Sequence, residues 1–175
     1  MSPRRQRLTT IVLMGVAGVG KSSVMEALAE RLRWPTAEGD ALHPASNVRK
    51  MAAGIPLTDA DRAPWLDRIA AWIGEREAER SSSVVTCSAL RRAYRHRLRR
   101  GHPSVWFVHL VAPEAVIAKR MEHRGGHFMP PSMLASQLET LEPLQHGEPG
   151  WAVDALAPPD QIAERIITDL GLDPG

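Results

Sequence analysis

The sequence is poor in cysteine and in long apolar runs. Cys87 is the only cysteine in 175 residues, which excludes an internal disulfide and is typical of a reducing compartment. No apolar run approaches the ~20 residues that are needed to span a bilayer. Arg4, Arg5 and Arg7 before an apolar run resemble a secretory signal, but that run is short and leads into a functional motif that cleavage would damage. We therefore expect a cytoplasmic protein with no membrane partner.

Net charge and aromatic side chains are also scarce. The formal net charge of +2 at pH 7 is too small to indicate a nucleic-acid or membrane surface. The arginine-rich stretch 91–100 contains one aromatic residue, Tyr94, where a nucleic-acid surface would interleave several. We expect no nucleic-acid partner. Apolar residues at 43% and charged residues at 24% are ordinary for a globular protein, and the length of 175 residues predicts a single domain, 1–175.

A glycine-rich motif follows the first apolar run. Residues 15–22 read G-x-x-x-x-G-K-S, after the apolar segment 11–14 and before a segment with helical spacing. This order of strand, phosphate loop and helix is the one that the nucleotide-triphosphate motif requires. Its glycines let backbone N–H groups close around phosphate oxygens, and the positive end of the helix dipole faces the same anion. The sequence therefore predicts that the protein binds ATP or GTP.

Two side chains of the motif have chemical roles. Lys21 can reach the β- and γ-phosphates, and the Ser22 hydroxyl can ligate Mg²⁺, so we expect Mg²⁺ to accompany the nucleotide. The predicted nucleotide-binding residues of this loop are Gly15, Val16, Ala17, Gly18, Val19, Gly20, Lys21, Ser22 and Ser23.

Strand and helix patterns alternate along the chain. The expected strands are 11–14, 35–38, 83–87, 105–111 and 151–154, and segments with helical spacing lie between them. This alternation predicts an α/β fold, a parallel sheet of about five strands with helices on both faces. Ligands of such folds bind at the carboxyl ends of the strands, where we expect the phosphate loop, Asp40 and Ser88. The segment 122–132, rich in glycine and proline, is predicted to be a mobile lid.

Phosphate-loop proteins include kinases, GTPases and motors. The sequence has no N-K-x-D element for reading guanine and no D-x-x-G after the second strand. A Gly39–Asp40 pair after that strand and a basic loop late in the chain favour a small kinase with a lid.

Longer blocks carry a resemblance to a known family. They are E-G-D-A-L-H-P (38–44), G-I-P-L-T-D-A-D-R-A-P-W-L (54–66), C-S-A-L-R-R-A-Y-R (87–95), R-G-G-H-F-M (124–129) and L-E-T-L-E (138–142). Together they resemble gluconokinase. The resemblance implies a nucleoside-monophosphate-kinase-like fold, often a homodimer. It also implies ATP-dependent phosphorylation of D-gluconate at the 6-hydroxyl, which feeds the pentose phosphate or Entner–Doudoroff route.

Two acidic residues follow the second strand. Asp40 is the candidate to accept or orient the proton of the substrate hydroxyl; the alternative is that it caps the next helix. Glu38 would share its side of the strand, where it assists Mg²⁺ through water or is a simple exposed carboxylate.

A sugar-acid substrate calls for arginine forks and short polar groups. Arg62, Arg91 and Arg95 are the candidates for binding it, and Arg91 and Arg95 lie four residues apart on one predicted helix face. Lys50 is either a further charge or an exposed lysine.

Other polar residues are candidates for hydrogen bonds to sugar hydroxyls. These are His43, His127 and Gln137, and the two histidines are candidates only through their family blocks. A lone histidine is otherwise more often structural.

The lid entrance carries two arginines. Arg120 and Arg124 would move onto the transferred phosphate when the lid closes; the alternative is that they complement a helix dipole.

Two alternatives to the whole interpretation stay open. One is a sister kinase acting on shikimate or a nucleoside monophosphate, and the other is a nucleotide-binding regulator without turnover.

Overall fold

The computed structural model describes residues 6–123 and 132–174. Five strands form one sheet in which every neighbouring pair is parallel, in the order β2-β3-β1-β4-β5. The strands are β1 (Thr10–Met14), β2 (Thr36–Glu38), β3 (Ser83–Thr86), β4 (Val105–Val111) and β5 (Gly150–Asp154). The predicted α/β fold is confirmed, including the short and compositionally weak second strand.

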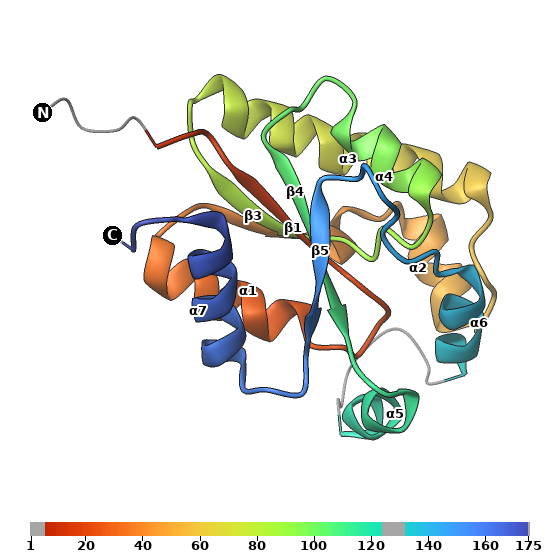
Figure 1. Ribbon diagram of the computed structural model, residues 1–175. Helices are drawn as coiled ribbons and strands as arrows, with labels where there is room; N and C mark the ends of the chain where they lie inside the picture. Colours follow the sequence, from red (N-terminus) through yellow and green to blue (C-terminus); the bar gives the residue numbers. More distant parts are fainter. Residues whose placement is uncertain (1–5, 124–131, 175) are drawn as a thin grey trace, which may run out of the picture.

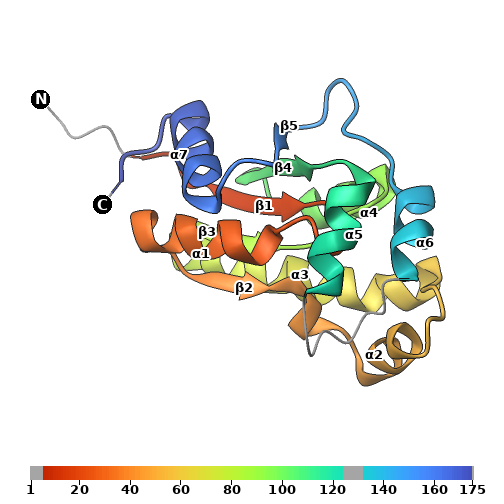
Figure 2. The ribbon, with the colours of Figure 1, turned by 90° about the horizontal axis from the view of Figure 1, so that it is seen from below.

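Helices cover both faces of this sheet (Figure 1). They are α1 (Lys21–Leu32), η1 (Gly39–Leu42), α2 (Ala45–Ala52), α3 (Asp59–Ala78), α4 (Arg92–Arg99), α5 (Glu114–Glu122), α6 (Met133–Thr140) and α7 (Pro159–Leu170), where η1 is a 3₁₀ turn. Helices α1 and α7 pack together on one face and α3 and α4 on the other (Figures 1 and 2). Helices α2, α5 and α6 gather beyond the carboxyl ends of the strands, where the sequence predicts the ligand to bind (Figure 2).

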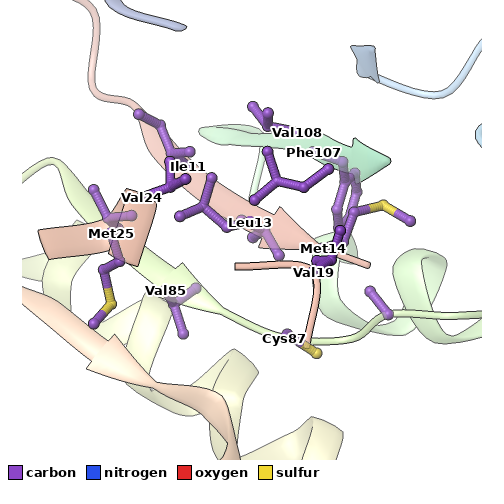
Figure 3. Packing of buried hydrophobic residues seen from close by; sticks show 14 of the residues in the cluster. Ile11, Leu13, Met14, Val19, Val24, Met25, Val85, Cys87, Phe107 and Val108 are labelled. Carbon is purple, nitrogen blue, oxygen red and sulfur yellow. The ribbon is translucent and has the colours of Figure 1, made fainter. Parts of the chain in front are cut away.

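The central strand reads as an unbroken apolar run because it is covered on both sides. Every residue of β1 is buried, and Ile11, Leu13 and Met14 lie among Val85 and Phe107 of the neighbouring strands (Figure 3). The phosphate loop leaves the end of this strand, so a fully buried strand fixes the position of the loop. No helix within the described ranges is long and apolar enough to cross a membrane.

Two helix starts show how local sequence fixes the elements around the site. Thr58 caps α3: its side chain accepts from the Asp61 N–H, and the Asp61 carboxylate accepts from the Thr58 N–H, which is a complete capping box. Helix α4 begins at Arg92, so Arg91 is its N-cap and Leu90 precedes it. The prediction that Arg91 and Arg95 share one helix face is therefore wrong, because the backbone of Arg91 is extended and not helical.

Candidate functional site

The phosphate loop connects β1 to α1 in a conformation that its glycines permit. Gly18 has a φ of 83°, and a Cβ at this position would lie 2.5 Å from Cγ of Met121 on α5. Helix α1 begins at Lys21, directly after Gly20, so the N-terminus of the helix faces the loop. The Lys21 ammonium donates to the carbonyls of Gly15 at 2.8 Å and Val16 at 3.0 Å. Lys21 thereby ties the first two residues of the loop together through their carbonyls.

A cleft that is partly open to solvent lies beside the phosphate loop at the carboxyl ends of the strands. Besides Ala17 and Gly18 of the loop itself, it brings together seven residues that were predicted from the sequence: Lys21, Ser22, Glu38, Asp40, His43, Arg62 and Gln137. They come from α1, β2, η1, α3 and α6 and from the connection between η1 and α2. Because the sheet is parallel, elements far apart in sequence end at this one edge.

Asp40 lies in the 3₁₀ turn η1 and borders the cleft. Its backbone carbonyl accepts from the His43 N–H at 3.3 Å, while Pro44 is the N-cap of the next helix and no side chain caps it. Among the described residues, none forms a hydrogen bond with the Asp40 carboxylate. The geometry thus favours a carboxylate available to a ligand over the helix-capping alternative.

Glu38 is tied to the neighbouring strand through Thr86, which sequence reasoning missed. The Gly39 N–H donates to Oγ1 of Thr86 at 3.1 Å, and this hydroxyl donates to Oε2 of Glu38 at 2.7 Å. A Cβ at residue 39 would lie 2.0 Å from the Thr86 carbonyl oxygen, so only glycine fits there. These contacts fix η1, and with it Asp40, against the end of β3.

His43 and Trp65 form a stacked pair at the wall of the cleft. Their ring centroids are 4.0 Å apart and the ring planes differ by 15°. The Trp65 indole N–H donates to the Gly39 carbonyl at 2.8 Å, which holds the pair against η1. Burial lowers the pKa of His43 to about 4; the charge of Arg62 acts in the same direction and that of Asp40 opposes it. The imidazole is therefore neutral at pH 7.

Of the three arginines predicted to bind substrate, Arg62 is the one that borders the cleft. Its guanidinium donates to the Leu57 carbonyl at 2.7 Å and to the Tyr94 hydroxyl at 3.0 Å. That hydroxyl donates in turn to Oδ1 of Asp59 at 2.5 Å. Both bonds from Arg62 are donated by Nη1, which fixes the direction of the guanidinium.

Gln137 reaches the phosphate loop from α6. Its Oε1 accepts from the Ala17 N–H at 2.7 Å, in a contact that spans 120 residues of sequence. Gln137 therefore joins the wall of the cleft to the loop itself.

Arg91 and Lys50 are not among the residues that line the cleft. Arg91 is half-exposed and 3.7 Å from Oδ2 of Asp59, and Lys50 donates to Oδ2 of Asp61 at 2.8 Å. The hydrogen bond from Lys50, with those from Thr58, holds the pKa of Asp61 at about 2. Both cations pair with aspartates in the first turn of α3, next to the cleft wall.

The position of Arg95 contradicts the role predicted for it. The sequence predicts that it binds substrate, but its side chain is 1% exposed and lies away from the cleft. It donates to both carboxylate oxygens of Glu148, at 2.7 and 3.0 Å, and to the Ala89 carbonyl at 2.8 Å. Arg95 is a buried structural cation that anchors α4 to the segment before β5.

Replacing Arg95 with methionine is expected to lower the free energy of unfolding by about 3–5 kcal/mol, because the Glu148 carboxylate is left buried and unpaired. Urea denaturation measures this change. The double variant R95M/E148M should recover part of the loss, since it removes both charges. A loss below about 1 kcal/mol, as for an exposed ion pair, would contradict the structural role.

Arg120 lies on the other side of the phosphate loop. Its guanidinium donates to the carbonyls of Val19 and Ala155, each at 2.8 Å. It borders a second cavity, open to solvent, which the late-chain residues Ala157 and Pro159 also line. No pattern in the sequence indicated that Ala157 and Pro159 would border such a cavity. The predicted Arg124 and His127, and nearly all of the predicted lid, lie outside the described residues.

His109 lies on β4 behind the phosphate loop and is 4% exposed. Burial lowers its pKa to about 4, and the charges of Arg95 and Lys21 act in the same direction. An unfolded histidine titrates near 6.5, so the unfolded chain binds this proton first as the pH falls. The contribution of neutral, buried His109 to stability is therefore complete above pH 6.5 and is lost as the pH falls from 6.5 to 4.

As the pH falls from 7 to 4, we therefore expect the titration of His109 to lower the free energy of unfolding by up to about 3 kcal/mol. Urea denaturation across this range, with the variant H109L, measures its share as the difference between the two pH profiles. The exposed His96 supplies the control variant, H96Q, which should keep the wild-type profile. Parallel profiles for H109L and wild type would contradict the assignment.

Comparisons with known proteins agree with this geometry. A family profile described as "AAA domain" matches residues 11–130. A gluconokinase from Gluconobacter oxydans (strain 621H) is 48% identical over 157 residues, which cover 90% of this chain and 88% of that protein. A crystal structure of a gluconokinase from Sinorhizobium meliloti 1021 has a TM-score of 0.80 at 52% identity and covers 94% of each chain. An unliganded sugar kinase from Janibacter sp. HTCC2649 has a TM-score of 0.90 at 46% identity, covering 95% of this chain and 96% of that one.

Proposed function

The chain belongs to the gluconokinase family, and from this premise we propose that it transfers the γ-phosphoryl group of ATP to the 6-hydroxyl of D-gluconate. The observation that carries the proposal is the shared cleft. The phosphate-loop residues Lys21 and Ser22, the carboxylate of Asp40 and the fork of Arg62 all border it. It therefore offers a site for a triphosphate, a proton acceptor and a cation for a sugar acid in one space.

The phosphate end of the reaction uses the loop and the start of α1. Main-chain amides and the helix N-terminus bind the phosphates, and Lys21 neutralises charge that develops on the transferred group. The residues present fit Mg²⁺, which phosphate-loop kinases bind with one hydroxyl, one or two carboxylates and the phosphates. Ser22 would hold it, with Glu38 or Asp40 acting through water. The ion would neutralise charge on the β- and γ-phosphates.

The acceptor end of the reaction uses Asp40. The substrate O6 forms a bond to the γ-phosphorus while the bond to the ADP oxygen breaks, and the O6 proton passes to the Asp40 carboxylate. The rigid mounting of η1 on Thr86 and Trp65 supports this role, because in-line attack requires a fixed acceptor.

The rest of the substrates can be assigned to the two sides of the loop. We propose that Arg62 binds the gluconate carboxylate and that His43 and Gln137 bind hydroxyls, since all three border the cleft. The second cavity would hold the nucleoside, with Arg120 between it and the loop. For Arg120 to reach the transferred phosphate, it must leave the carbonyls of Val19 and Ala155.

Several predictions from the sequence remain part of the proposal. Arg124 and His127 would act from a lid, and one domain would assemble into a homodimer in the cytoplasm. Arg91 and Lys50 were predicted to bind substrate; because neither borders the cleft, we propose that they support the rim of the sugar site. Light scattering on the purified protein tests the dimer.

An acceptor panel tests the reaction. ADP release is measured with gluconate, shikimate, AMP and CMP, each supplied separately with Mg²⁺ and ATP. We expect turnover with gluconate alone. Turnover confined to shikimate or a nucleotide would identify a sister kinase, and ATP binding without turnover on any acceptor would support a regulator.

A further inference from the structure

Asn47, on α2, is a buried amide that contacts the wall of the cleft; its residue is 2% exposed. Its Nδ2 lies 2.9 Å from the backbone carbonyl oxygen of Asp61 and 3.2 Å from Nδ1 of His43. A carbonyl oxygen only accepts hydrogen bonds, so the atom that faces it must be the amide nitrogen. The Asp61 carbonyl thus fixes the orientation of the amide, and the second N–H of Nδ2 is directed by the same constraint toward His43.

The donor on Asn47 determines which nitrogen of His43 carries the proton. A nitrogen that accepts a hydrogen bond has no proton, so Nδ1 is bare and the neutral ring carries its proton on Nε2. Stacking on Trp65 fixes the ring plane. The charged groups that influence the ring are Asp40 of η1 and Arg62 of α3. No described residue forms a hydrogen bond with Nε2, and the ring borders the cleft.

We propose that Asn47 holds His43 as the Nε2–H tautomer, and that this N–H donates a hydrogen bond to a hydroxyl oxygen of the acceptor substrate. The second half of this statement rests on the proposed function. Asn47 is then a positioning residue, and His43 is a neutral donor instead of a proton acceptor. The division of labour follows: Arg62 provides charge for the carboxylate, His43 recognises a hydroxyl, and Asp40 accepts the proton.

The tautomer is tested without any substrate. Long-range ¹H–¹⁵N spectra of the ¹⁵N-labelled full chain at pH 7 distinguish a protonated Nε2 from a protonated Nδ1, and H43Q identifies the signals by their loss. We expect Nε2–H in the wild type. The variant N47D offers an acceptor in place of the donor and should shift the proton toward Nδ1. Nδ1–H in the wild-type spectrum would overturn the proposal, whether or not the protein phosphorylates gluconate.

A pair of substitutions tests the donor role by kinetics. Glutamine places its amide near the position of Nε2, whereas asparagine places it near Nδ1. If Nε2–H donates to substrate, H43N raises KM for gluconate about 10- to 100-fold more than H43Q does, as expected for one hydrogen bond. KM for ATP should change little in both. Equal KM values for H43N and H43Q would overturn the donor role and leave the tautomer result standing. The pair also decides the donor role if N47D does not fold.

Discussion

Replacing Asp40 with asparagine is expected to lower kcat with gluconate about 10³-fold, the middle of the range for losing a general base. Asparagine has the size of aspartate but does not accept the O6 proton. The phosphate loop is untouched, so binding of ATP should remain within several-fold of wild type. Steady-state ADP release gives kcat, and calorimetric titration with a non-hydrolysable ATP analogue gives the affinity.

Two matched variants make the result specific. Asp67 is an exposed carboxylate that pairs with Arg97 outside the cleft, so D67N should retain wild-type kcat. Glu38 lies two residues from Asp40 and also borders the cleft, so E38Q tests the competing carboxylate. If E38Q loses as much kcat as we expect for D40N while D40N remains active, Glu38 is the proton acceptor and the assignment of Asp40 is wrong.

The position of Asp40 at the cleft could be predicted because it depends mainly on patterns of neighbouring residues. The strand before the phosphate loop, the loop and the helix after it are contiguous, and their spacing predicts β1, the glycine turn and α1. Asp40 follows the next strand, and a parallel sheet brings the carboxyl ends of its strands to one edge. Two short-range patterns and one topological rule were therefore enough to place Lys21, Ser22 and Asp40 around one cleft.

The arginines show where this logic fails. Arg62, Arg91 and Arg95 have the same chemistry, and nothing in their local sequence separates them. Their roles depend on partners far along the chain: Tyr94 for Arg62 and Glu148, 53 residues away, for Arg95. A buried carboxylate facing a buried arginine is a property of the packed molecule, which spacing within one helix does not reveal.

The same limit applies to the residues that were missed. Thr86 and Asn47 act through hydrogen bonds to η1, Glu38 and His43 that depend on the packing of separate elements. Thr86 had one available signal, because it ends a buried strand beside Ser88, at the edge where ligands bind. Asn47 belongs to the segment after the second strand that carries the family resemblance, but no local pattern predicted a role for its side chain. The location of a side chain at the cleft was thus predictable where its place at the end of a strand determines it. It was not predictable where a hydrogen-bond partner from a distant part of the chain determines it.

Replacing Arg62 with leucine is expected to raise KM for gluconate about 100-fold, because a hydrogen-bonded charge pair with the carboxylate is lost. R62K should lie between wild type and R62L, since lysine keeps the charge without the planar fork. The neighbouring cation Arg91 supplies the control: it pairs with Asp59 and does not border the cleft, so R91L should change KM by only a few-fold. Thermal unfolding of each variant shows whether the loss of the Arg62 bonds to Leu57 and Tyr94 disturbs the fold.

A neutral polyol separates recognition of the carboxylate from general damage to the site. Sorbitol has hydroxyls like those of gluconate but no carboxylate, so wild type should use it poorly and R62L should use it about as well as wild type does. The ratio of kcat/KM for gluconate to that for sorbitol should therefore fall about 100-fold in R62L and remain near wild type in R91L. If R62L loses activity equally with both acceptors, Arg62 shapes the cleft through Tyr94 and Leu57, and the carboxylate is bound by another cation. A fall of the gluconate-to-sorbitol ratio in R91L would then identify Arg91 as that cation.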